Sequence, residues 1–231
     1  VIPAAMTAIN SHAILPIARE CAKLDGDIWI VYMGNNEFVG PFGAGTPPGW
    51  AVRALLSLKA TRTGQLLEAV ARKFSSKETP KEWGSMKMFM QNQVAPNDPK
   101  RARVYGNFAK NLEDILRVGK RSGAKVIASS VISNLKDCAP FASMEPSAEA
   151  EFAKKNFVAA RDYDALAFRA DSKINAAIQT EAEQNGVPFV DAAKAFEIPG
   201  AEYLYEHVHL NPDGNYKLAV LLADSVAAQL K

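Results

Sequence analysis

Ile28-Trp29-Ile30-Val31-Tyr32-Met33 is an unbroken apolar run, and Gly34-Asn35-Asn36-Glu37 follows it directly. An apolar run of this length that stops at a glycine is typical of a strand buried on both faces of a parallel sheet. Three other runs have similar length and flanking residues. The sequence therefore predicts four parallel strands: Val1 to Ala4, Ile28 to Met33, Lys125 to Ser130, and Val187 to Val190.

Helical periodicity separates these runs. Between residues 101 and 121, apolar side chains such as Phe108, Leu112 and Ile115 recur at spacings of three and four, and Gly123 follows, as is common after a helix. Similar patterns predict helices over 7–24, 152–184 and 215–231. Strands that alternate with helices predict one domain over residues 1–231, a three-layer α/β/α fold with a doubly wound, mostly parallel sheet.

Two segments interrupt this alternation. Gly40 to Trp50 is dense in Gly and Pro and follows a strand end, where open α/β sheets bind ligands. Lys81 to Lys100 contains a cluster of aromatic and methionine residues. Such an excursion, around residues 40–100, suits a lid over a substrate site. Ordinary packing against the domain explains it equally well.

Charge and composition exclude several classes of protein. The 27 basic and 25 acidic residues give a formal net charge of +2, and they are scattered rather than gathered in the basic stripe that nucleic-acid binding needs. No apolar run approaches the ~20 residues that cross a bilayer. Cys21 and Cys138 lack the spacing of a zinc site, and no cofactor is expected. The compartment stays open, with an extracytoplasmic or periplasmic location slightly favoured over the cytoplasm.

Two polar segments could carry chemistry. Asn36 follows a predicted strand end, where a side-chain amide can donate to a developing oxyanion, although Gly-Asn-Asn alone is more often a simple turn. Glu206-His207-Val208-His209 precedes Asn211-Pro212-Asp213-Gly214 and the last predicted helix. A carboxylate three residues before a histidine can fold back and orient the imidazole as a general base. A helix-entry loop with exposed histidines is the alternative interpretation.

Together the two segments resemble the SGNH, or GDSL-type, hydrolases, in which short sequence blocks supply Ser, Gly, Asn and His. Gly34-Asn35-Asn36-Glu37 is similar to the block Gly-x-Asn-Asp, and Glu206-His207-Val208-His209 is similar to the block Asp-x-x-His. The segment 4–11 looks like the second block, with Ala5 at its glycine position. The phrases at 32–37, 133–138 and 168–172 look like a bacterial subgroup of SGNH-like domains found in large repeat-containing proteins.

The resemblance implies a flavodoxin-like SGNH fold and a serine ester hydrolase, with carbohydrate O-acyl esters as a common substrate class. It makes His209 the base, Glu206 its orienting acid and Asn36 an oxyanion donor. Gly34, Ala5, Asn35 and Glu37 would then line the oxyanion hole or the substrate site, and the partner is a small-molecule or carbohydrate ester.

The chain departs from the family in three ways. Gly-Asp-Ser is absent, which predicts that the first strand and its serine precede Val1, so that the domain is N-terminally truncated and these 231 residues are inactive alone. Ala5 replaces a glycine, and Glu37 and Glu206 replace aspartates. Because the nucleophile is missing, a non-catalytic binding domain is the alternative function. A metal site at Glu206, His207 and His209 is disfavoured, because two imidazoles are too few ligands.

Overall fold

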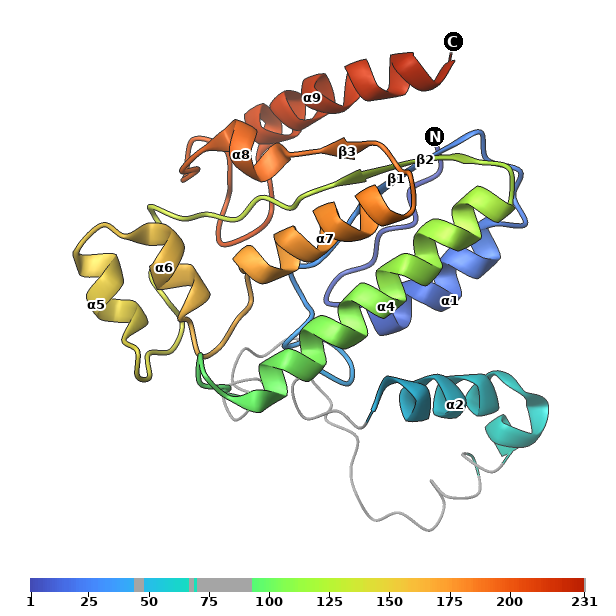
Figure 1. Ribbon diagram of the computed structural model, residues 1–231, viewed down its shortest axis with the longest axis horizontal. Coiled ribbons are helices and arrows are strands. Elements are labelled where there is room, and N and C mark those ends of the chain that lie inside the picture. The colour runs from blue at the N-terminus through green and yellow to red at the C-terminus, as the bar shows by residue number, and fades with distance from the viewer. Residues whose placement is uncertain (44–47, 67–68, 70–92, 231) are drawn as a thin grey trace.

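The computed structural model describes residues 1–43, 48–66, 69 and 93–230. Its centre is a parallel sheet of three strands in the order β1-β2-β3 (Figure 1), made of β1 (Ile28–Tyr32), β2 (Lys125–Ser129) and β3 (Phe189–Val190). Ile28 of β1 lies opposite Lys125, and Ala128 of β2 lies opposite Phe189. The predicted α/β class with a parallel sheet is confirmed.

Helices lie on both faces of this sheet (Figure 1). One side carries α1 (Ser11–Cys21), α4 (Pro99–Arg121) and α7 (Ser172–Gln184), and the other carries α8 (Ala192–Phe196) and α9 (Pro212–Leu230). The remaining described helices are α2 (Gly49–Ala60), α5 (Ala148–Ala153) and α6 (Phe157–Asp162). One or more helices thus separate each strand from the next along the described chain.

Helix α4 forms the centre of the larger apolar core. Its first turn is fixed by the Asp98 side chain, which accepts a hydrogen bond from the backbone N–H of Lys100, and by Pro99 at the first helical position. Phe108 and Leu112 lie on the face that packs against α1, α7 and the sheet, and both are completely buried. Burying a side chain of this size contributes roughly 1.5–3 kcal/mol.

The predicted first strand is wrong. Val1 to Ala4 is exposed, and within the described chain its backbone pairs with no neighbouring strand. An apolar run becomes a strand only where another strand satisfies its N–H and C=O groups. β1, the nearest strand, is separated from this segment by an open groove.

The predicted continuous helix over 152–184 is also wrong. Lys155, at φ 62°, ends the first helical segment, and residues 163–171 form an irregular connection between α6 and α7. Aspartates organise this connection: Asp164 accepts from the N–H of Leu166, and Asp171, the N-cap of α7, accepts from the N–H of Ile174 in the first turn of that helix. Side-chain acceptors that satisfy backbone donors in this way compete with helix formation.

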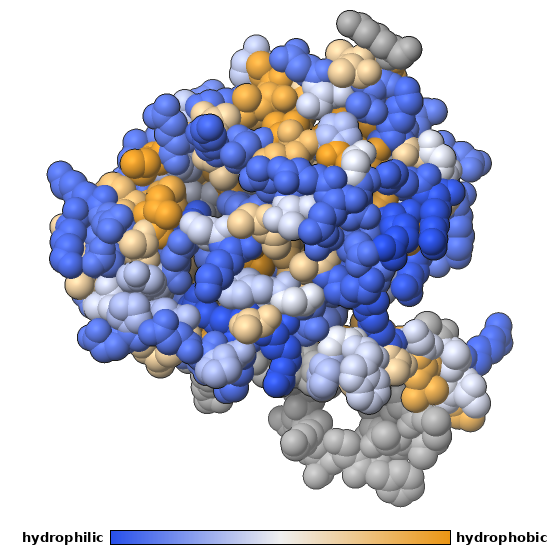
Figure 2. Space-filling model, viewed as in Figure 1, coloured by the Kyte–Doolittle hydropathy of each residue, from blue (hydrophilic) through white to orange (hydrophobic). Residues whose placement is uncertain are grey.

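Nearly half of the predicted lid, around residues 40–100, lies outside the described residues, including 44–47 of the Gly40–Trp50 segment and 81–92 of the Lys81–Lys100 segment. The part that is described contains α2, which Arg53 ties to α4 through Asp114 (2.6 Å) and Asn111 (2.7 Å). Trp50 and Leu58 of α2 are exposed, and Figure 2 shows apolar surface over this helix. Among the described helices, none has the length and apolar character needed to span a membrane.

Candidate functional site

The carboxyl ends of the strands bring four loops into contact. Asn35, just after β1, accepts a hydrogen bond through Oδ1 from the N–H of Ala170 (3.0 Å). Asn134, after β2, donates its N–H to the carbonyl of His207 (2.9 Å). The His207 ring in turn packs against Phe168, with ring centroids 5.7 Å apart. The segment around residues 168–170 therefore connects the loop that carries Asn36 with the loop that carries His209.

One carboxylate organises the loop before α9. Oε1 of Glu206 accepts from the N–H of His209 (2.9 Å) and contacts its Nδ1, while Oε2 accepts from the N–H of His207 (2.7 Å) and contacts its Nδ1. Because a carboxylate only accepts, Nδ1 of His209 carries the proton and the neutral ring has its lone pair on Nε2. That nitrogen has no hydrogen bond to any described residue, and the side chain is 67% exposed. This is the arrangement of a general base oriented by an acid.

Charge balance around Glu206 favours its ionised form. Burial by itself raises the pKa of the Glu206 carboxyl, but the hydrogen bonds from His209 and the attraction of His207 outweigh burial and hold the pKa below its usual value. For His207 the dominant effect is again burial, which lowers its pKa. The Glu206 carboxylate raises the pKa, but only partly offsets this shift.

His207 does not fit a loop of fully exposed histidines, the alternative interpretation of this segment. Its side chain is 24% exposed and packs edge-on against Phe141 and Phe168. The sequence also assigned the acid to His209 alone, whereas the structure joins Glu206 to both rings. Both histidines, one and three residues after Glu206, reach its carboxylate because the chain turns tightly between residues 206 and 209. His12, by contrast, is buried, and its Nδ1 lies 3.1 Å from the side-chain nitrogen of Asn111.

Asn36 lies in the loop after the carboxyl end of β1. Its backbone carbonyl accepts from the N–H of Gly40 (2.7 Å), while its side-chain amide has no hydrogen-bond partner within the described residues. Gly34 makes the sharp turn that leads to it, with a φ of 147°, and a Cβ there would meet Cγ2 of Ile174 at 2.8 Å. A side chain would be strained at this position, so glycine is required by both conformation and space.

Glu37 and Asn35 have structural partners. The Glu37 side chain is 4% exposed and accepts from the backbone N–H of Ser11 (2.8 Å) and from its hydroxyl (2.7 Å). It thereby supplies the first turn of α1 with the acceptor that its N-cap, Asn10, does not provide. Contact of Glu37 and Asn35 with a substrate stays a prediction. In the structure, their hydrogen bonds hold the loop that contains Asn36.

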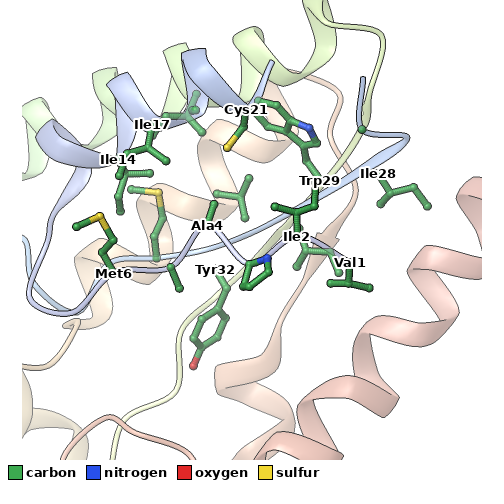
Figure 3. A pocket seen from close by; sticks show the side chains of 18 of the residues that line it. Val1, Ile2, Ala4, Met6, Ile14, Ile17, Cys21, Ile28, Trp29 and Tyr32 are labelled. Atoms are coloured by element: carbon green, nitrogen blue, oxygen red, sulfur yellow. The ribbon is translucent and has the colours of Figure 1, made fainter. Parts of the chain in front are cut away.

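A groove of about 940 Å³ runs along β1, and Gly34, Asn35 and Asn36 are among the residues that line it. Val1 to Met6 forms one wall, and α1 and β1 form the others (Figure 3). Ala5 also lines this groove and is exposed, so four of the five predicted oxyanion-side residues line it, whereas Glu37 does not. Glu206 and His209 are not among the described residues that line it. No family model matches the chain, and no curated protein matches it.

Two charged residues that support the site were not predicted. Asp164 accepts from the N–H groups of Phe141 and Ala142, and Arg169 donates to the carbonyls of Asn134 and Cys138. Both are buried and form an ion pair at 3.3 Å. Asp164 and Arg169 lie five residues apart within a segment predicted to be helical, so the sequence did not indicate that they would bind the backbone of neighbouring loops. The described residues hold no cluster of three or more His, Cys, Asp or Glu side chains that could bind a metal ion.

Proposed function

We propose that this domain is a serine ester hydrolase of the SGNH type, with carbohydrate or other small-molecule O-acyl esters as substrates. The observation that carries the proposal is the Glu206–His209 pair, in which the carboxylate holds Nδ1 and leaves Nε2 without a partner among the described residues. The free amide of Asn36, on a neighbouring loop at the same sheet edge, supports it. The flavodoxin-like form of the α/β fold is part of the same proposal.

In this mechanism a serine hydroxyl loses its proton to Nε2 of His209 as its oxygen bonds to the acyl carbon. The side-chain amide of Asn36 and a backbone N–H near Ala5 donate to the oxyanion, and such donors contribute roughly 2.7–4 kcal/mol each. The tetrahedral intermediate then expels the alcohol, which takes the proton from Nε2. Water repeats the sequence and releases the acid. Glu206 remains ionised and stabilises the imidazolium that forms twice.

Residues 1–231 do not contain the Gly-Asp-Ser block that carries the nucleophile in the family. Ser130, which follows β2, donates instead to Asp191 at 2.9 Å. In the proposal the serine comes from polypeptide outside residues 1–231. If no such serine exists, the domain is a binding module, and the exposed, unpartnered groove beside Asn36 is the observation that favours this second function.

A serine-directed fluorophosphonate probe tests the proposal on the full gene product. Labelling should fall at a serine, disappear in His209→Ala and fall at least about tenfold in Glu206→Gln, since the base loses its orientation. Tyr205→Ala, an exposed position in the same loop, is the matched control and should keep its labelling. A folded gene product that is not labelled, or that keeps its labelling in His209→Ala, would overturn the hydrolase and leave the binding module.

A further inference from the structure

One face of helix α2 packs against the rest of the domain. A Cβ at Gly49 would lie 2.6 Å from Oδ1 of Asn107 of α4, so the two helices approach closely there. Val52 is completely buried, and Arg53 donates to Asp114 of α4 at 2.6 Å. Because residues three and four apart share one side of a helix, the side of α2 that holds these residues faces α4.

The opposite face of α2 is apolar and exposed. Trp50, Ala54 and Leu58 follow one another at intervals of four residues, and Leu55 lies beside this row. Trp50 is 74% exposed and Leu58 is 50% exposed. Figure 1 shows α2 at the periphery of the molecule, and Figure 2 shows apolar surface over it. Apolar side chains gathered in this way mark an interaction site, because a partner would remove their surface from water.

The charges in and around α2 indicate what the partner is. No Asp or Glu lies between Glu37 and Glu68, whereas Arg53, Lys59 and Arg62 are basic. Lys59, in the last turn of α2, and Arg62, just after the helix, are both exposed. An anionic surface attracts such a segment through its basic residues and meets no carboxylate that it would repel.

The length and composition of α2 fit a helix that lies on a bilayer. A helix of 12 residues is about 18 Å long, well short of the roughly 30 Å hydrocarbon core of a membrane. A short helix with Trp and Leu on one face and basic residues nearby can instead lie in the plane of the membrane interface. Trp50, near the amino end, supplies the kind of ring that is enriched at this depth.

We propose that α2 docks this domain on the surface of a membrane that contains anionic phospholipid. Trp50, Leu55 and Leu58 enter the interface, and Lys59 and Arg62 lie beside the lipid phosphates. Burial of the apolar row and attraction of the two basic residues act together, as stable attachment of a peripheral protein requires. The inference goes beyond the proposed hydrolysis, because docking needs no turnover.

Hydrogen bonds connect the docking helix to the candidate site. Arg53 of α2 donates to Oδ1 of Asn111 (2.7 Å), and the Asn111 amide donates to the hydroxyl of Ser11 (3.0 Å). The same hydroxyl donates to Glu37, the residue after Asn36. A membrane bound by α2 would therefore lie at a defined place relative to the loop that contains Asn36.

Sedimentation with lipid vesicles tests the docking. The 231-residue chain should bind vesicles made of equal parts phosphatidylcholine and phosphatidylglycerol. Its affinity for vesicles of phosphatidylcholine alone should be on the order of tenfold weaker, because Lys59 and Arg62 lose their attraction to the surface. Added salt should weaken binding to the mixed vesicles. Failure to sediment with the mixed vesicles would overturn the proposal.

Matched variants identify the contact. Leu58→Ser should weaken vesicle binding on the order of tenfold, whereas Val220→Ser, at an exposed apolar position of α9, should not change it. Arg62→Glu should weaken binding several-fold, whereas Arg121→Glu, at the exposed end of α4, should not. Since all four side chains are exposed, each variant should keep the urea unfolding curve of the wild type, which shows that the fold is intact.

Equal effects within either pair of variants would also overturn the proposal. So would a dimer in sedimentation equilibrium that Leu58→Ser dissociates, because the apolar face of α2 would then be an interface between two copies of the chain. The two proposals of this article fail separately. Vesicle binding without fluorophosphonate labelling of the gene product would refute the hydrolase and leave the docking intact, and labelling without vesicle binding would do the reverse.

Discussion

The carboxylate of Glu37 accepts hydrogen bonds from both the backbone N–H and the hydroxyl of Ser11, so one buried side chain joins the loop after β1 to the start of α1. Asn111 extends this contact, because its amide donates to the same hydroxyl (3.0 Å). The position of Asn36, the residue before Glu37, thus depends on a buried polar cluster.

The free energy of unfolding should fall as the pH rises from about 4.5 to about 7. Burial raises the pKa of Glu37 from 4.5 to about 7, although both hydrogen bonds from Ser11 oppose the shift. The folded state therefore holds this proton more tightly than the unfolded chain. Its stabilising contribution is complete below pH 4.5 and is lost as the pH passes 7, a loss on the order of 3 kcal/mol.

Urea unfolding of the wild type and of Glu37→Gln at several pH values measures this contribution. The variant keeps the shape of the protonated acid and should show a flatter pH dependence. The difference between the two proteins separates Glu37 from His12, whose lowered pKa acts in the opposite direction. Glu20→Gln, at an exposed position, should not change the pH profile, and an unchanged profile in Glu37→Gln would contradict the assignment.

The pKa of His207 should fall further when Glu206 is changed to Gln. Burial lowers that pKa and the Glu206 carboxylate opposes it, so removal of the negative charge leaves burial unopposed. An NMR titration of the His207 ring carbons would record the shift. Glu202→Gln, at the exposed partner of Lys136, should leave the titration unchanged, and a rise in the His207 pKa in Glu206→Gln would refute the arrangement.

Gly34→Ala should destabilise the protein by about 1–3 kcal/mol, because the residue has a φ of 147° and its new Cβ would lie 2.8 Å from Ile174. Gly106→Ala is the matched control. That glycine lies within α4, and its Cβ would meet no atom within 4 Å. Alanine there should stabilise by about 0.5–1 kcal/mol. Chemical denaturation measures both, and a neutral Gly34→Ala would show that the turn can relax.

Arg101→Met should cost about 3–5 kcal/mol of stability. The buried guanidinium donates to the carbonyls of Ala95, Val94, Asp162 and Asp164, all of which would lose a donor. Arg121→Met, at the exposed end of the same helix, should change stability by less than about 0.5 kcal/mol. Thermal or urea unfolding compares the two, and equal effects would show that the carbonyls find water instead.

The sequence predicted what depends on local pattern. The apolar run at 28–33 and the spacing of Phe108 and Leu112 identified β1 and α4, because burial on one or both faces leaves a period in the sequence. The offset between Glu206 and His209 likewise predicted their contact. These features need no knowledge of distant residues.

What the sequence did not predict depends on neighbours. Val1 to Ala4 has the composition of a strand, but a strand needs a partner edge, and none pairs with it among the described residues. Asp164 and Asp171 interrupt the helical pattern at 152–184 because their carboxylates bind backbone N–H groups, which periodicity does not show. The packing of His207 on Phe141 and Phe168 arises from three loops that meet only in the folded chain.

Since Glu206 binds both imidazoles, the two histidines are thermodynamically coupled. A double substitution at 207 and 209 will not equal the sum of the single ones, because each ring competes for the same negative charge. A positive charge on the exposed ring of His209 thus disfavours a positive charge on the ring of His207, which packs against Phe141 and Phe168. A change in the charge of His209 therefore changes the electrostatic environment of the half-buried His207.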